Sequence, residues 1–155
     1  MTSTLTAATL TTTITESISL NGSDQGATNT FTVASIVEVD KRIVNVPTSE
    51  VTILAMGTAL ASGQFDEDDV KYLRITNKDD TNHVTLTFKN ENSDEMCTKL
   101  DAGQSYLYGT DNSGGVKDTM DADSSAISVS LGDLVDITAI ADTAAVDLEI
   151  FVAST

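Results

Sequence analysis

The sequence predicts an all-β protein, a single-domain antiparallel β-sandwich for which a jelly roll is one available form. Three observations predict it: apolar and polar residues alternate in short runs, turn-forming residues separate these runs, and no strong 3.6-residue periodicity is present. A chain of 155 residues is long enough for one domain with a real core. Only 5% of its residues are aromatic and Trp is absent, so that core must be largely aliphatic.

The clearest alternation lies in residues 70–89, where two runs rich in β-branched residues flank the turn-forming sequence NKDDTN. This pattern predicts an antiparallel hairpin, whose apolar face a second sheet must cover. A second hairpin is expected around a turn at residues 141–145, with Val135, Ile137 and Ala139 sharing one face of its first strand. Together the two hairpins predict a buried set of nine residues: Leu73, Ile75, Val84, Leu86, Phe88, Ile137, Val146, Leu148 and Ile150.

The N-terminal segment is rich in threonine and poor in charge. Threonine favours an extended backbone, so residues 2–13 are either the first strand of the sandwich or an arm that orders against another molecule. We expect an extended arm over residues 1–13, followed by the sandwich domain over residues 14–155. A first strand from Leu10 should end at the turn of residues 21–26.

Further strands follow in order. Residues 29–39 should form a strand with Phe31, Val33, Val37 and Val39 on one face, and a turn at residues 40–42 should lead to a strand that Pro47 ends. Residues 51–56 favour a strand over a short helix across residues 49–61, because the segment begins with β-branched residues. Strands are also expected near residues 96–100 and 105–108, and residues 110–123 form the longest irregular region.

The net charge of −16 limits the classes of partner. A field of that sign repels phosphate backbones and anionic lipid, so we expect no nucleic-acid partner and no membrane partner. The N-terminus lacks the features of a signal peptide, and no apolar run reaches membrane-spanning length. The single cysteine, Cys97, rules out an intrachain disulfide, as is usual for a protein of a reducing cytoplasm, and it should be buried or half-buried.

The sequence predicts no catalytic, cofactor-binding or metal-binding residues, and the protein is expected not to be an enzyme. It has one histidine, His83, no Gly-x-Ser-x-Gly elbow and no Gly-rich phosphate loop, and one Cys with one His cannot form a protein-only zinc site. The acidic residues at 66–69, and Asp118, Asp121 and Asp123, could offer oxygen ligands to Ca²⁺, but they lack the EF-hand spacing and are better explained as solvated loop charge. Two carboxylates that are distant in sequence could still meet in space as a catalytic pair. A cleft that cleaves sugars, however, would normally contain more aromatic residues than this chain has.

Three segments carry a resemblance to a known family: YLRITNKDDTNHVTLTF (residues 72–88), LDAGQS (residues 100–105) and ITAIADTAAVDLEIFVAS (residues 137–154). In this order they resemble small virion structural proteins of tailed bacteriophages, especially marine and cyanobacterial phages. The resemblance covers the C-terminal half, and residues 1–50 carry little of it.

What the resemblance implies is a β-sandwich subunit present in many copies and without enzymatic activity. The leading expectation is a capsid decoration (cement) protein that binds the outer surface of the major capsid protein and stabilises the head. It would be a homo-oligomer, most simply a trimer, located on the virion surface after assembly in the cytoplasm of the host bacterium. The alternatives are a head-to-tail connector, a tail or fibre-associated subunit, or a soluble carbohydrate- or ligand-binding module.

Overall fold

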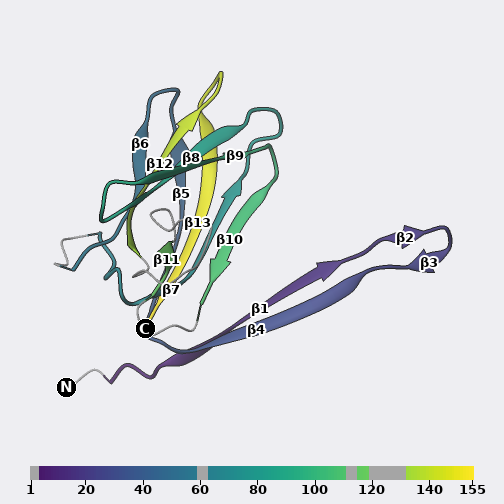
Figure 1. Cartoon of the computed structure of the whole chain (residues 1–155), viewed down its shortest axis with the longest axis horizontal. Coiled ribbons are helices and arrows are strands. Elements are labelled where there is room, and N and C mark those ends of the chain that lie inside the picture. Colours follow the sequence, from purple (N-terminus) through teal and green to yellow (C-terminus); the bar gives the residue numbers. More distant parts are fainter. Residues whose placement is uncertain (1–3, 59–62, 111–114, 119–131) are drawn as a thin grey trace, which may run out of the picture.

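A computed structural model describes residues 4–58, 63–110, 115–118 and 132–155, which form a β-sandwich and a long hairpin that projects from it (Figure 1). These residues contain no helix, and therefore none that is long and apolar enough to span a membrane. The strands are β1 (Ala8–Glu16), β2 (Ser19–Leu20), β3 (Ser23–Asp24), β4 (Ala27–Ile36), β5 (Glu38–Val46), β6 (Val51–Ala55), β7 (Val70–Asn77), β8 (Val84–Asn90), β9 (Glu95–Leu100), β10 (Ser105–Gly109), β11 (Lys117–Asp118), β12 (Gly132–Ala141) and β13 (Val146–Ser154).

The sandwich has the strand order of a jelly roll. Sheet 1 runs β10-β7-β13-β5, and sheet 2 runs β12-β8-β9, with β6 and the short β11 pairing with β12. All of these pairings are antiparallel. If β11 is set aside, sheet 1 holds the first, eighth, third and sixth strands of the sandwich, and sheet 2 holds the second, seventh, fourth and fifth. This order confirms the predicted β-sandwich in its jelly-roll form.

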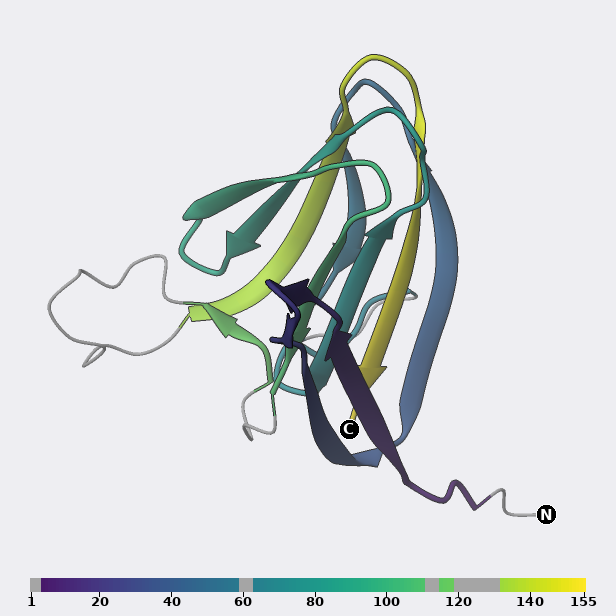
Figure 2. The ribbon, with the colours of Figure 1, turned by 90° about the vertical axis from the view of Figure 1, so that its right-hand side faces the viewer.

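The two predicted hairpins are wrong as paired units. β7 pairs with β10 and β13, whereas β8 pairs with β9 and β12, so the turn between β7 and β8 carries the chain from one sheet to the other. The turn between β12 and β13 does the same, as the two views of the ribbon show (Figures 1 and 2). Alternation of apolar and polar residues identifies which side chains face the core. It does not show whether the next strand in the chain pairs in the same sheet or belongs to the facing sheet.

The predicted core is confirmed. All nine residues lie between the two sheets, with exposed fractions of 3% or less. Val135 is the exception on β12: a register shift between Leu134 and Asp136 places Leu134 in the core and leaves Val135 half-buried. The extra residue of such a bulge reverses the alternation on one side of it, so the predicted inward face for Val135 is wrong.

The strand boundaries predicted from the sequence are partly wrong in the first half of the sandwich. The predicted turn at residues 40–42 is wrong, because β5 continues through it with Lys41 opposite Phe151 of β13. The predicted strand over residues 29–39 is instead divided at Val37 between β4 and β5, two residues after Ser35, whose φ of 63° lies in the left-handed region. β5 does end immediately before Pro47, and residues 51–55 form a strand and not a helix, as predicted.

The NKDDTN turn is built by side chains that replace backbone pairing. Asn77 is fully buried and donates from Nδ2 to the carbonyl oxygens of Asn82, at 2.9 Å, and Leu100, at 3.2 Å. Asp79 accepts backbone N–H bonds from Thr81 and Asn82 through Oδ1. These bonds favour the ionised carboxylate and lower the pKa of Asp79. The turn is therefore fixed locally, in agreement with its prediction from sequence.

Candidate interaction surface

The projecting hairpin is formed by β1 and β4, which pair in a two-stranded sheet separate from both sheets of the sandwich. β2 and β3 continue it to a two-residue turn at Asn21 and Gly22, both with positive φ, as an Asn-Gly hairpin turn requires. In Figure 1 the hairpin starts below the sandwich and extends away from it to the right. The predicted boundary between residues 13 and 14 falls within β1, where Thr13 pairs with Thr30.

The two faces of the hairpin differ in chemistry. One face carries the apolar residues together with polar neighbours: Leu10 lies opposite Val33, Thr12 opposite Phe31, and Ile14 opposite Asn29. The other face is almost entirely threonine, in three cross-strand pairs: Thr11 with Thr32, Thr13 with Thr30, and Thr15 with Thr28. The hydroxyls of the middle pair lie 3.1 Å apart. Threonine pairs of this kind stabilise the extended backbone without needing a core beneath them.

The base of the hairpin is fixed to the outer face of sheet 1 by a second hydrophobic cluster. The rings of Phe31 and Tyr72 lie 6.1 Å apart between centroids, and Tyr72 and Phe151 meet edge to face at 5.7 Å. Gly109 permits this approach, since a Cβ atom there would lie 2.5 Å from a ring carbon of Phe31. The cluster consists of buried Val33, Ile36, Tyr72 and Ala153, with Leu10, Phe31, Leu107 and Phe151 packed against it.

Over the distal half of the hairpin, residues 13–30, none of the described residues forms a covering layer. Every one of these residues is exposed, including Ile14 at 40%, Ile18 at 56% and Leu20 at 61%. A two-stranded hairpin with no second layer is marginally stable in water. Exposed apolar residues on such an element are typical of a surface that another molecule covers.

The hairpin is also the least charged large element of the chain. Residues 4–36 contain two acidic residues, Glu16 and Asp24, and no Lys, Arg or His. Because the whole chain carries −16, the remainder carries −14. Contact through the hairpin therefore requires little removal of water from charged groups.

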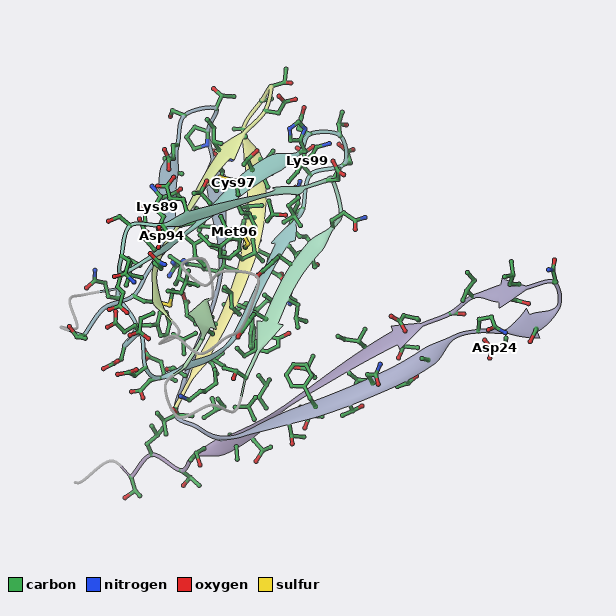
Figure 3. All side chains as sticks on the ribbon, in the orientation of Figure 1. Asp24, Lys89, Asp94, Met96, Cys97 and Lys99 are labelled. Atoms are coloured by element: carbon green, nitrogen blue, oxygen red, sulfur yellow. The ribbon has the colours of Figure 1, made fainter. Side chains whose placement is uncertain are left out.

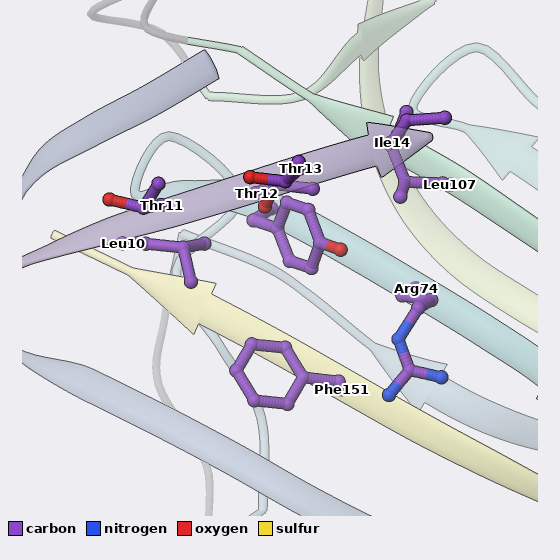
Figure 4. Close-up of a pocket in the computed structure, with 9 residues that line it drawn as sticks. Leu10, Thr11, Thr12, Thr13, Ile14, Arg74, Leu107 and Phe151 are labelled. Atoms are coloured by element: carbon purple, nitrogen blue, oxygen red, sulfur yellow. The ribbon is translucent and has the colours of Figure 1, made fainter. Parts of the chain in front are cut away.

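A cleft of about 350 Å³ opens where the hairpin leaves sheet 1 (Figure 4). Its only charged lining residue is Arg74, which contacts Glu149 with Nη2 2.6 Å from Oε1. Lys41 lies beside the same carboxylate, at 3.6 Å. The hydrogen bond from Arg74, helped by the charge of Lys41, lowers the pKa of Glu149. Arg74 is thus neutralised within the sheet, and the cleft presents mainly apolar and threonine surface: its lining is Leu10, Thr11, Thr12, Thr13, Ile14, Tyr72, Arg74, Leu107 and Phe151.

A second exposed apolar surface lies on β5, at the edge of sheet 1. In the described residues β5 pairs with β13 alone, so its other edge is open. Val39 and Ile43 point outward with exposed fractions of 54% and 64%, and Lys41, whose side chain is 59% exposed, lies between them. We refer to Val39, Lys41 and Ile43 as the β5 stripe. A long open edge with apolar side chains is a site at which sheets associate.

The outer face of sheet 2 carries a polar network instead. Glu50 accepts hydrogen bonds from Thr138 at 2.6 Å and from Lys89 at 3.2 Å, and Lys89 also contacts Glu95 at 3.3 Å. These partners lower the pKa of Glu50 and raise that of Lys89. Burial raises the pKa of Asp136 nearby. Glu50 and Glu95 thus share the Lys89 ammonium, which Figure 3 labels, whereas Asp136 Oδ1 is buried without a hydrogen-bond partner.

The residues considered from sequence as candidates for chemistry do not come together. His83 lies beside the NKDDTN turn, with Nδ1 3.6 Å from a carboxylate oxygen of Asp142. Cys97 is exposed, so its predicted burial is wrong: it lies on the edge strand β9 opposite Thr87, on the outward face (Figure 3). Among the described residues, no group of three or more His, Cys, Asp or Glu is placed to hold a metal ion. The side chains of Asp118, Asp121 and Asp123 lie outside the described residues.

Sequence reasoning missed the hairpin as a separate element, although two signals for it exist. The Asn21-Gly22 dipeptide is a strong hairpin turn signal, and alternate threonines flank it on both sides. Comparisons with protein-family models, with curated proteins and with solved structures found no match for the chain.

Proposed function

We propose that the chain is a structural subunit of a virion, present in many copies, and that it decorates the capsid of a tailed bacteriophage. The observation that carries the proposal is the exposed distal half of the hairpin, residues 13–30. An element of this length, with apolar residues on one face and no layer over it, gains its stability when a neighbouring subunit covers it. A subunit of an assembly always has such a neighbour.

Two further features support this proposal. The jelly roll is a common architecture of viral capsid domains, as it is of lectin domains. The sequence segments at residues 72–88, 100–105 and 137–154, which resemble virion proteins, form the strands and turns of the sandwich. The acidic surface would keep many copies soluble before they bind, and the major capsid protein is the expected partner.

Immunogold labelling of particles from lysates of the infected host tests this function. Label spread over the heads at a density near the number of capsomers is the expected result. Label confined to the neck or tail would replace decoration by the connector or tail alternative. Absence of label from purified particles, together with glycan binding by the purified chain, would overturn the virion role in favour of a carbohydrate-binding module.

A further inference from the structure

In the part of the chain that the structure describes, two apolar surfaces of sheet 1 and its hairpin are uncovered. One is the distal half of the hairpin, with Ile14, Ile18 and Leu20, and the other is the β5 stripe. Figure 1 shows the distal half of the hairpin pointing away from the sandwich, so it does not reach β5 of its own chain. Within the described residues, neither surface is covered by another part of its own chain, and a second copy can supply a partner to each.

The base of the hairpin shows how the hairpin binds a sheet. There the apolar face, through Leu10 and Phe31, covers part of the outer face of sheet 1 over β7 and β13. The β5 stripe is the adjoining part of that same outer face: Val39 lies opposite Ala153, and Lys41 lies opposite Phe151. Both Ala153 and Phe151 belong to the cluster that the base covers. The uncovered stripe is therefore continuous with an existing hairpin-binding surface.

Charge favours contact between these two surfaces. Two copies with a net charge of −16 each repel one another over most of their area. The hairpin contributes only Glu16 and Asp24, both acidic, whereas the centre of the β5 stripe is Lys41, a cation that lies 3.6 Å from Glu149 and whose side chain is still 59% exposed.

We propose that the distal half of the hairpin of one copy docks on the β5 stripe of a second copy. The apolar face with Ile14, Ile18 and Leu20 would lie against Val39 and Ile43. Each copy offers both surfaces, so the contact is head-to-tail and closes into a ring if the rotation between copies permits. This inference rests on the proposed function in one respect, that many copies lie close together, but it needs no capsid.

Mixing two single-cysteine proteins tests the contact directly. In a Cys97→Ser background, one protein carries Ile18→Cys and the other carries Ile43→Cys, and the mixture is treated with a short bis-maleimide. The mixture should give a crosslinked dimer, whereas either protein alone should give little. Replacing Ile43→Cys by Met96→Cys provides the control, because Met96 is also exposed but lies on sheet 2 (Figure 3).

Charge substitutions supply a second readout in solution. Ile18→Asp and Ile43→Asp should each weaken self-association by at least tenfold in sedimentation experiments, which is about 1.4 kcal/mol. Met96→Asp adds the same charge elsewhere and should leave it unchanged. Crosslinking of Ile18→Cys protein with itself, or equal crosslinking to positions 43 and 96, would overturn the proposal. Because these experiments use the purified chain, their failure is distinct from a failure to find the chain on virions.

Discussion

Tyr72 on β7 and Phe151 on β13 meet edge to face on the outer face of sheet 1, with an interplanar angle of 81°. Tyr72 is only 5% exposed, although it points away from the main core. It is buried because Phe31 and Val33 of the hairpin cover it. The pair therefore anchors the base of the hairpin, β1 and β4, to the sandwich.

Removing the Tyr72 ring should release the hairpin. Tyr72→Ala leaves Phe31 and Phe151 without their shared neighbour, and truncating a buried aromatic residue costs about 3–5 kcal/mol. Hydrogen exchange should show much faster exchange of the amides of β1 and β4 than in the parent protein. Tyr72→Phe keeps the ring and should preserve their protection. Equal protection in both variants would mean that the base is held by other contacts.

A single methyl group at Gly109 should disturb the same junction. In Gly109→Ala the new Cβ atom would meet the ring of Phe31, which has to rotate or withdraw. Overpacking of this kind costs about 1–3 kcal/mol. Gly57→Ala is the matched control, since nothing lies within 4 Å of a Cβ atom there. Urea unfolding of the two variants measures the difference, and equal midpoints would contradict the close approach of hairpin and sheet.

The main core provides a third test. Leu86 on β8 is fully buried between the sheets, and Leu86→Ala should lower the free energy of unfolding by about 2–5 kcal/mol through lost burial and the cavity left behind. Thr85→Ala changes the neighbouring residue, which points outward and is only partly buried, and should alter stability by no more than about 0.5 kcal/mol. An unchanged unfolding midpoint for Leu86→Ala would refute the sandwich assignment of that face.

Much of the sandwich could be predicted because alternation is a local property. The inward faces of β7, β8 and β13 follow from period-2 patterning, and their core residues are all buried. Pairing is a non-local property, so the sequence could not show that β7 and β8 face one another across the core. The bulge at Val135 and the left-handed backbone of Ser35 could not be predicted either. At each place a single residue changes which side chains face inward, and the composition of the segment gives no sign of it.

The candidate surface was only partly predictable. The low charge and threonine content of residues 2–13 indicated a segment suited to contact, and Thr11 and Thr13 do lie on the projecting hairpin. The contribution of β4 was missed, because Phe31 and Val33 read as an ordinary core-facing strand. They do pack inward, but against the outer face of sheet 1 and not between the two sheets.

Stability at acid pH should depend on Glu149. Its pKa is lowered below the ordinary value of 4.5, mainly by the hydrogen bond from Arg74. The stabilisation is therefore complete above pH 4.5 and is lost as the pH falls through the lower, folded-state pKa. The difference in Tm between the parent protein and Glu149→Gln should be greatest at neutral pH and should shrink below pH 4.5. Arg74→Gln should move the titration of Glu149 back towards its ordinary value, as an NMR titration would show; an unmoved titration would assign the shift to another cause.

The sandwich should fold without the distal hairpin. Thr13 and Thr30 are cross-strand partners, so residues 14–29 can be replaced by Asn-Gly, the dipeptide that suits a two-residue hairpin turn. The residues removed are all exposed, and the base cluster around Tyr72 and Phe151 is kept. The free energy of unfolding of this monomer in urea should therefore change by less than about 1 kcal/mol. A variant that lacks residues 4–36 is the contrasting control, because it uncovers Tyr72 and Phe151 and should be clearly destabilised. If the shortened chain is destabilised as much as that control, then the distal half supports its own sandwich, and its exposed apolar face is not reserved for a neighbour.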